Sequence, residues 1–353
     1  MTNVVTFPGL GLEFELNRVA FTIGGKEIYW YGIIIAAGFL LAVAYGIWRA
    51  PRFAVDQDKL TDAIFFAVPA AIIGARLYYV IFNPSNYVRE DGSFDWFGAI
   101  SFWDGGLAIY GGVIATVIVA ILYCKVRKMD FWSGMDITVY GLLIGQLVGR
   151  WGNFVNVECY GGVTSLPWRM CSTSIANELL RDGLIESGAV YQSILDGELG
   201  VHPTFIYESL WNLLGFILLV LLARRGRKFN GQMFLSYVVW YGLGRSVIEG
   251  MRTDSLYFFN TGLRSSQILG IVSAVVGIAL IVIRLRTAGP ATPPYPKGVV
   301  RDAQLLALQT AQNEAVSEKP AEQEPTPPVD MADFPEEEAN EQKEETKDGG
   351  SFD

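Results

Sequence analysis

Residues 149–162 place polar and charged side chains where a membrane-spanning segment should be apolar. The stretch reads Gly-Arg-Trp-Gly-Asn-Phe-Val-Asn-Val-Glu-Cys-Tyr-Gly-Gly and follows the apolar run Ile137–Val148. A charged side chain at the bilayer centre costs about 2.5–3.5 kcal/mol on insertion scales, so it normally faces a protein interior or a water-filled cavity. On a helix, Arg150 and Asn153 share one face. The stretch predicts a polar site in the membrane body; the alternative is a helix end with solvated polar groups.

A second polar stripe lies in residues 241–252. Tyr241, Arg245, Glu249 and Arg252 are spaced to fall on one face of a helix. The spacing predicts an Arg245–Glu249 ion pair, and a self-neutralising pair near a helix end is the bland alternative. An arginine fork matches the geometry of a phosphate and keeps its charge at any relevant pH. Together with Arg150, the stripe predicts an anionic ligand at membrane depth, for which a phospholipid headgroup fits better than a soluble phosphate ester.

Three further polar positions leave alternatives open. Arg76 lies within an apolar segment, either as the structural partner of a carboxylate such as Glu208 or Asp136, or as a ligand-binding group. His202 precedes Pro203 at a predicted helix start, where it is a candidate base or a capping residue. Tyr110 offers a phenol beside two glycines.

The elements that must position these residues are membrane spans. Of the 353 residues 51% are hydrophobic, the mean hydropathy is +0.30, and several apolar segments reach the roughly 20 residues that cross a bilayer. We therefore expect an all-α polytopic membrane protein whose body, residues 28–286, contains about seven transmembrane helices. The predicted spans are 28–48, 62–82, 107–123, 137–155, 204–223, 232–248 and 267–283.

Loop charges predict the orientation of these spans. Loops 49–61, 124–136 and 223–232 carry 3, 3 and 4 Lys/Arg, whereas the alternate loops 84–106, 156–203 and 251–265 carry 1, 2 and 2. Because cytoplasmic loops are enriched in Lys and Arg, the first group is expected inside the cell. The N-terminus is then outside, the C-terminus is cytoplasmic, and residues 149–162 face the outer leaflet.

The segments outside the spans differ in character. Residues 1–27 are expected to be an amphipathic interfacial lead-in without a cleavable signal peptide. Residues 156–203 predict a small extracytoplasmic arm or head, with a helix near residues 174–182. Residues 287–353 form a Pro/Glu-rich cytoplasmic tail that we expect to be mostly disordered, and a solvated tail is weighed against an interaction segment.

The acidic side chains of this tail account for the net charge of −9 of the whole chain. Residues 313–353 hold 14 acidic and 3 basic side chains, a net of −11, which leaves about +2 for the rest. Nothing here predicts a nucleic-acid partner.

Cysteines and histidines do not predict a metal site. Cys124, Cys159 and Cys171 form no C-x-x-C pair, and His202 is the single histidine. Cys159 and Cys171 could form a disulfide if their loop lies outside, or remain ordinary thiols.

The pattern Gly-Arg-Trp-Gly-Asn-Phe-Val-Asn-x-Glu-x-x-Gly of residues 149–161 resembles the signature of the prolipoprotein diacylglyceryl transferase family. Four more blocks are similar to the family's in the same order, at residues 29–32, 105–112, 202–208 and 241–249. The resemblance covers roughly residues 28–283.

This resemblance implies a reaction. The diacylglyceryl group of phosphatidylglycerol would pass to the lipobox cysteine thiol of a preprolipoprotein signal peptide, forming a thioether and releasing glycerol 1-phosphate. The partners would be phosphatidylglycerol, signal peptides and membrane lipid, with no cofactor. The location would be the bacterial cytoplasmic membrane, with the active site toward the outer leaflet.

The resemblance also implies roles for individual residues. Arg150 and Arg245 would bind the phosphate, Asn153 and Glu158 would position the headgroup, Glu249 would orient Arg245, Tyr31 would line the lipid site, and Gly161 belongs to the same set.

Tyr110 departs from the family pattern, because many members carry a histidine there that has been proposed to deprotonate the thiol. A phenol with a pKa near 10 is a poor base at neutral pH. Either Tyr110 acts by hydrogen bonding, or the arginine field activates the thiol, or water serves as the base.

Three rival functions remain to be compared. A transporter or channel would suit intramembrane charges, but no inverted repeat is evident. A transferase that uses a nucleotide-activated headgroup would need an aspartate cluster for a divalent metal, which the predicted spans lack. A scaffold that binds a partner through the acidic tail would leave the outward polar site unexplained.

Overall fold

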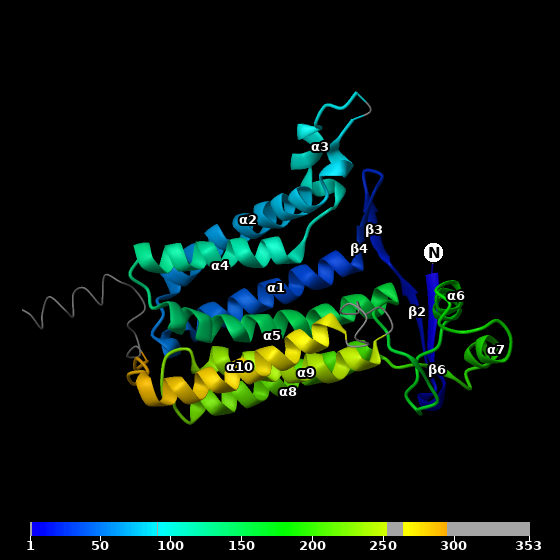
Figure 1. Cartoon of the computed structure of the whole chain (residues 1–353). Helices are drawn as coiled ribbons and strands as arrows, with labels where there is room; N and C mark the ends of the chain where they lie inside the picture. The colour runs from blue at the N-terminus through cyan, green and yellow to red at the C-terminus, as the bar shows by residue number, and fades with distance from the viewer. Residues whose placement is uncertain (1, 90, 253–263, 295–353) are drawn as a thin grey trace, which may run out of the picture. The chain divides into compact units, whose positions relative to one another are not determined.

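The computed structural model describes residues 2–89, 91–252 and 264–294 (Figure 1). This part of the chain is mostly helical. The tail predicted to be disordered lies outside the described residues from position 295 onward. The helices are α1 (Trp30–Arg49), α2 (Gln57–Phe82), α3 (Trp96–Ile100), α4 (Ile109–Val126), α5 (Phe131–Asn156), α6 (Thr173–Arg181), α7 (Ala189–Leu195), α8 (Thr204–Arg224), α9 (Gln232–Ile248) and α10 (Ser265–Thr287).

Six of the described helices are long and apolar enough to cross a membrane, which makes the chain a polytopic membrane protein. They are α1, α2, α4, α5, α8 and α10. Their outer faces carry exposed apolar side chains such as Leu40, Ile73 and Val275, as expected of helices that contact lipid. The remaining predicted span, 232–248, is the 17-residue helix α9.

Helix α5 is the centre of the bundle. It packs against α1, α8 and α9, and α9 in turn packs against α10 (Figure 1). The core between these helices is aromatic and aliphatic: Tyr140 of α5 is fully buried and donates to the backbone oxygen of Leu219 in α8 at 3.0 Å. Because α5 contacts three neighbours, side chains on several of its faces meet other helices rather than lipid.

Helices α2 and α4 form a separate close pair. A Cβ placed on Gly111 of α4 would lie 2.2 Å from the backbone oxygen of Gly74 in α2, so no side chain fits there. Small residues allow helices in a membrane to approach closely and gain van der Waals contact. The pair makes fewer contacts with α1 and α5 than its two helices make with each other.

One end of the bundle is tied together by a buried carboxylate. Asp136 of α5 accepts hydrogen bonds from the Arg227 guanidinium at 3.0 Å and from the backbone N–H groups of Gly231 and Phe234 at 2.9 and 3.0 Å. The guanidinium of Arg227 also lies 4.8 Å from the Phe53 ring centroid. These contacts join the end of α1, the start of α5 and the α8–α9 connection, which are segments rich in Lys and Arg.

The opposite end of the bundle carries a small lobe. Its core contains Val5, Met170, Ile175, Leu179 and Val201, and it extends onto the ends of α5 and α8. The helix predicted near residues 174–182 is present as α6. Short strands β5 (Val163–Thr164) and β6 (Gly200–Val201) pair antiparallel within the lobe.

The N-terminal segment folds as two hairpins, whereas an amphipathic lead-in and an all-α fold were expected. Strands β1 (Thr2–Phe7) and β2 (Leu12–Asn17) pair antiparallel, as do β3 (Val19–Ile23) and β4 (Lys26–Tyr29). In β1, Val5 and Phe7 are buried and alternate with less buried residues, which is the period of a strand. Thr6 exchanges two 2.9 Å backbone hydrogen bonds with Cys171, so β1 belongs to the lobe that sequence reasoning assigned to residues 156–203 alone.

Candidate active site

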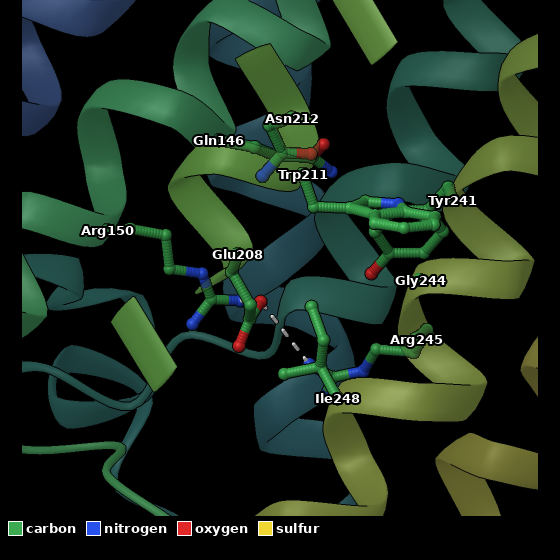
Figure 2. Close-up of a pocket in the computed structure, with 9 residues that line it drawn as sticks. All are labelled: Gln146, Arg150, Glu208, Trp211, Asn212, Tyr241, Gly244, Arg245 and Ile248. Carbon is green, nitrogen blue, oxygen red and sulfur yellow. Dashed lines mark ion pairs between the residues drawn. The ribbon is translucent and has the colours of Figure 1, made fainter. Parts of the chain in front are cut away.

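The two polar stretches predicted from the sequence meet between α5, α8 and α9. Arg150 forms an ion pair with Glu208 Oε2. Arg245 Nη1 lies 3.9 Å from the same oxygen. Figure 2 shows Glu208 between the two arginines. Arg150 comes from the end of α5, Glu208 from the first turns of α8, and Arg245 from the end of α9. One carboxylate therefore holds two arginines that are 95 positions apart in the sequence.

The predicted pair between Arg245 and Glu249 is present. Arg245 Nη2 lies 2.8 Å from Glu249 Oε2, and Glu249 Oε1 accepts a hydrogen bond from the Ser266 hydroxyl at 2.7 Å. Arg264 donates to the backbone oxygen of Glu249. Glu249 is 3% exposed, so it orients Arg245 from a fixed position rather than from solvent.

Arg252 completes the charge cluster, with Nη1 3.3 Å from Glu208 Oε1. The cluster, defined here as Arg150, Glu208, Arg245, Glu249 and Arg252, holds three positive and two negative charges. Arg150 and Arg245 both line the same small cavity, so an anion that entered it would meet two guanidinium groups.

Asn153 and Glu158 extend the cluster by hydrogen bonds. Arg150 Nη1 donates to Asn153 Oδ1 at 3.3 Å, and Asn153 Nδ2 donates to Glu158 Oε1 at 2.8 Å. Asn156 Nδ2 reaches the same Glu158 oxygen at 3.3 Å. Val157 ends α5 in the left-handed region with φ of 54°, which turns the chain so that Glu158 returns over the last turn. The face predicted from the spacing of Arg150 and Asn153 is confirmed.

Gly161 joins three segments behind the cluster. Its N–H donates to the His202 backbone oxygen at 2.9 Å, and the neighbouring Gly162 N–H donates to Met251 O at 2.8 Å. A Cβ on Gly161 would lie 2.8 Å from both the Met251 oxygen and the His202 Cβ. Glycine is therefore required by close approach, and Gly161 holds the start of α8 against the segment that follows α9.

Tyr31 lies across from the last turns of α5. A Cβ on Gly152 would lie 2.8 Å from the Tyr31 ring, so the ring packs directly on the α5 backbone. Tyr31, Arg150 and Asn153 line one cavity together. The predicted association of Tyr31 with the arginine stretch is thus present in the structure.

Two cavities meet at Arg150. The first, which we call the apolar groove, has a volume of about 670 Å³ and is lined by α1, α2, α5 and Ile109 of α4. Its lining is mostly aliphatic and aromatic, including Phe39 and Leu60, with Tyr31, Arg150 and Asn153 among its polar members. Because both Ile137 and Asn153 line it, the groove follows α5 for roughly 24 Å at 1.5 Å per residue.

The second, which we call the polar cavity, has a volume of about 40 Å³ and lies between α5, α8 and α9 (Figure 2). Its lining residues are Gln146, Arg150, Glu208, Trp211, Asn212, Tyr241, Gly244, Arg245 and Ile248. Gln146 and Arg150 also line the apolar groove. The long apolar groove therefore lies beside a small charged cavity, and these two side chains of α5 border both.

Tyr110 is placed apart from the charge cluster. It lies on α4, its side chain is 64% exposed, and its ring centroid is 6.5 Å from that of Tyr78 on α2. Among the described residues Tyr110 is not part of the lining of either cavity, although its neighbour Ile109 borders the apolar groove.

Arg76 is not paired with Glu208 or Asp136, and that sequence expectation was wrong. Its guanidinium donates to backbone oxygens of the α2–α4 connection: Gly98 at 2.6 Å, Ala99 at 2.9 Å, Gly106 at 2.9 Å, and Gly105. The backbone carbonyl groups of this loop accept hydrogen bonds from the guanidinium and so offset the cost of burying its charge. Arg76 therefore needs no carboxylate partner.

His202 lies in the lobe, just before α8. Its Nδ1 is 3.2 Å from the Tyr207 hydroxyl, which also accepts a 2.7 Å hydrogen bond from the Trp168 indole N–H. Burial lowers the pKa of His202 below its ordinary value, so the imidazole is neutral at pH 7. Cys159 and Cys171 form no disulfide; the Cys171 thiol donates to Leu199 O at 3.1 Å.

Sequence reasoning missed the position of Glu208 and the two amides of the polar cavity, Gln146 and Asn212. Each is a polar residue in a segment otherwise able to span a membrane, and that alone was a usable signal. Glu208 and Asn212 are also four residues apart on α8, as are Gln146 and Arg150 on α5. The missing information was which helices place these faces together.

Comparison with known proteins identifies one family. Residues 18–283 match the family model described as prolipoprotein diacylglyceryl transferase. A protein of Oceanobacillus iheyensis named phosphatidylglycerol–prolipoprotein diacylglyceryl transferase is 42% identical over 275 residues, which cover 77% of this chain and 89% of that protein. Proteins of the same name from Pediococcus pentosaceus (40% identical, 80% and 95% covered) and Bacillus velezensis (39%, 79% and 96%) are similar over the same extent.

Proposed function

We infer the chemistry of this site from the premise that the chain belongs to the prolipoprotein diacylglyceryl transferase family. It is a transferase that moves the diacylglyceryl group of phosphatidylglycerol to a prolipoprotein, the first step of lipoprotein lipidation. The acceptor is the lipobox cysteine thiol of the signal peptide.

The observation that supports this function best is the position of Arg150 between two cavities. The apolar groove has the length and lining for acyl chains, while the polar cavity carries the charge cluster. A phospholipid that lies along the groove would place its phosphate at Arg150. The carbon that bonds to sulfur would then lie at the junction of the two cavities.

The transfer is a substitution at that carbon. The cysteine sulfur forms the C–S bond, the C–O bond to phosphate breaks, and glycerol 1-phosphate leaves with the electron pair. The leaving phosphate changes from a monoanionic diester to a monoester that carries more negative charge. Arg150 and Arg245 stabilise this charge as it develops, because fixed donors in a site of low dielectric act most strongly on the transition state.

The two glutamates of the cluster act on the arginines. Glu208 lies between Arg150 and Arg245 and keeps them from moving apart, while Glu249 orients Arg245. Asn153 contacts Arg150 from the other side and is itself held by Glu158, so these two residues position the headgroup through its phosphate. Tyr31 lines the lipid site where the groove reaches Arg150.

Activation of the thiol needs no side-chain base in this arrangement. The guanidinium groups of Arg150 and Arg245 favour the thiolate form of an approaching cysteine. The departing phosphate monoester, whose second pKa is near 6, can take up the proton. Tyr110 is 64% exposed and lies on the α2–α4 pair. We therefore propose that it contributes to the structure around the apolar groove and does not transfer a proton.

We also propose seven spans, with α9 as the additional one. At one end of α9, Arg284 of α10 donates to Asn230 O at 2.8 Å; at the other, Ser266 contacts Glu249. The helix therefore runs the length of its neighbour α10. With the following turn Glu249–Met251 it comprises 20 residues, about the 30 Å of a bilayer core.

The orientation follows from the charges at the two ends. The end that contains Asp136 and Arg227 holds all three Lys/Arg-rich loops, which favours the cytoplasmic side. The charge cluster is at the other end, toward the outer leaflet, and the lobe of residues 156–203 is extracytoplasmic. The membrane is the bacterial plasma membrane, since the relatives are bacterial enzymes.

The test is direct. The purified protein is incubated with phosphatidylglycerol and a lipobox peptide, and the peptide is weighed by mass spectrometry. We expect a mass gain of one diacylglyceryl group and none for the Cys→Ser peptide. No gain in detergent that supports a control transferase would refute the proposed reaction.

A further inference from the structure

The polar cavity continues one helical turn deeper than the charge cluster. Gln146 precedes Arg150 by four residues on α5, Asn212 follows Glu208 by four on α8, and Tyr241 precedes Arg245 by four on α9. In each case the step leads from the helix end toward the middle of the bundle. The cavity therefore has a charged outer layer and a neutral polar inner layer (Figure 2).

The inner layer has hydrogen-bonding capacity that the described protein does not use. Gln146 Nε2 donates to the Tyr237 hydroxyl at 2.9 Å, but Gln146 Oε1 is buried and has no partner among the described residues. Asn212 is 6% exposed, and none of the hydrogen bonds of the described residues involves its side-chain amide. A buried polar group without a partner is unfavourable, so Gln146 Oε1 is a position where a bound hydrogen-bond donor would be stabilised.

Trp211, the residue before Asn212, lines the cavity and belongs to a stacked aromatic pair. The rings of Trp211 and Trp240 stack with centroids 4.2 Å apart. Each indole N–H donates to the other residue's backbone oxygen, at 3.2 and 3.1 Å. A Cβ on Gly244 would lie 2.1 Å from the Trp211 indole nitrogen, so the Trp211 ring packs directly on the backbone of α9.

We propose that Gln146 and Asn212 bind the free hydroxyl groups of the headgroup glycerol, and that this contact selects phosphatidylglycerol among phospholipids. The inference rests on the proposed function and adds to it the residues that recognise the headgroup. Acyl chains would occupy the apolar groove, the phosphate would bind at Arg150 and Arg245, and the headgroup glycerol would enter the polar cavity.

The chemistry of the inner layer favours a hydroxyl. A hydroxyl both donates and accepts, so it satisfies the Gln146 amide in either orientation of its oxygen and nitrogen, and the Asn212 amide as well. An ester carbonyl only accepts, so it would satisfy the Gln146 amide in one of its two orientations and leave Oε1 without a donor in the other. An ammonium headgroup would bring positive charge into a cavity lined by Arg150 and Arg245.

The dimensions agree with this assignment. One turn of helix is about 5.4 Å, which is comparable to the reach of a three-carbon alcohol from its phosphate. A cavity of about 40 Å³ exceeds the 10–15 Å³ needed for one water molecule, so it admits hydroxyl groups and excludes a bulky sugar headgroup.

The experiment compares two lipid donors in the peptide-transfer assay. Phosphatidylglycerol is measured against phosphatidylpropanol, which has the same charge and a three-carbon headgroup without hydroxyls. We expect the wild type to prefer phosphatidylglycerol in kcat/KM by tenfold or more. Asn212→Leu and Gln146→Met should lower kcat/KM for phosphatidylglycerol about tenfold each and leave that for phosphatidylpropanol within twofold, so that the preference disappears.

Two control variants distinguish loss of headgroup recognition from loss of structure. Ser246→Ala removes a hydroxyl of α9 that donates to Leu243 O and lies outside the cavity lining, and it should keep the preference of the wild type. Asn212→Gln, which retains the amide, should restore part of the preference.

Equal losses with both lipids in the Asn212 and Gln146 variants would overturn the recognition role, as would a wild type that does not discriminate while transferring diacylglyceryl groups. A wild type that transfers from neither lipid would instead refute the reaction and the recognition role together.

Discussion

Arg76 and Arg150 are both arginines in membrane-spanning helices, and they satisfy their charge in opposite ways. Arg76 donates to four backbone oxygens of one loop and is buried. Arg150 is partly exposed, pairs with the side chain of Glu208, and borders two cavities. The acceptors of Arg76 belong to the backbone of a loop, whereas Arg150 is held by a side chain and borders two cavities that an anion could enter.

The difference shows what an intramembrane charge means. The cost of burying an arginine predicts that it has partners, but it does not say whether these partners hold a loop or a ligand. The deciding feature is access to a cavity, because Arg150 lines both cavities and Arg76 lines neither.

The largest expected effect is the loss of activity in Arg150→Lys. A lysine keeps the charge but cannot make the bidentate contact to phosphate, and removal of one such transition-state donor costs about 10²–10³-fold. We expect kcat/KM to fall by about that factor in the peptide-transfer assay, with an unchanged melting temperature. Full activity in Arg150→Lys and in the matched Arg245→Lys would show that bidentate phosphate binding is wrong.

The second effect is on stability and concerns Arg76→Met. Loss of the guanidinium leaves the carbonyl oxygens of residues 98, 99, 105 and 106 without their donor, and we expect about 3 kcal/mol of destabilisation. Thermal unfolding in detergent measures it. Activity per folded molecule should remain within about threefold of the wild type at low temperature. A stable Arg76→Met protein with lost activity would reverse the roles assigned to the two arginines.

A smaller effect is expected for Glu208→Gln. The amide keeps the shape and a hydrogen bond but loses the charge that holds Arg150 and Arg245 together, so we expect kcat/KM to fall by roughly tenfold. The affinity for phosphatidylglycerol should change less than kcat, because the arginines remain. If the variant gains activity, Glu208 competes with the phosphate instead of positioning the arginines.

The smallest effect is predicted for Tyr110→Phe, on the same helix pair as Arg76. Because Tyr110 lies outside the charge cluster, we expect transfer rates within about threefold of the wild type and the same pH profile between pH 6 and 9. A loss of the alkaline or acidic limb of that profile would show that the phenol transfers a proton after all.

Local patterns predicted much of this fold. The apolar segments located six spans and α9, the spacing of Arg245 and Glu249 predicted their ion pair, and residues 174–182 predicted α6. Strand β1 was missed because the core cluster that buries Val5 and Phe7 draws its other buried members from residues 154–205. Short strands gain their stability from such partners, which lie far away in the sequence.

The sequence by itself determined that polar residues would lie within the otherwise apolar helices α5 and α9. It also determined which of them share a face, because that depends only on their spacing along one helix. It also predicted the family through residues 149–162. Only the tertiary structure decided that Glu208 belongs with Arg150, that Arg76 binds a loop, and that Gln146 and Asn212 form an inner polar layer. These pairings depend on which helix faces meet, and no spacing within one helix carries that information.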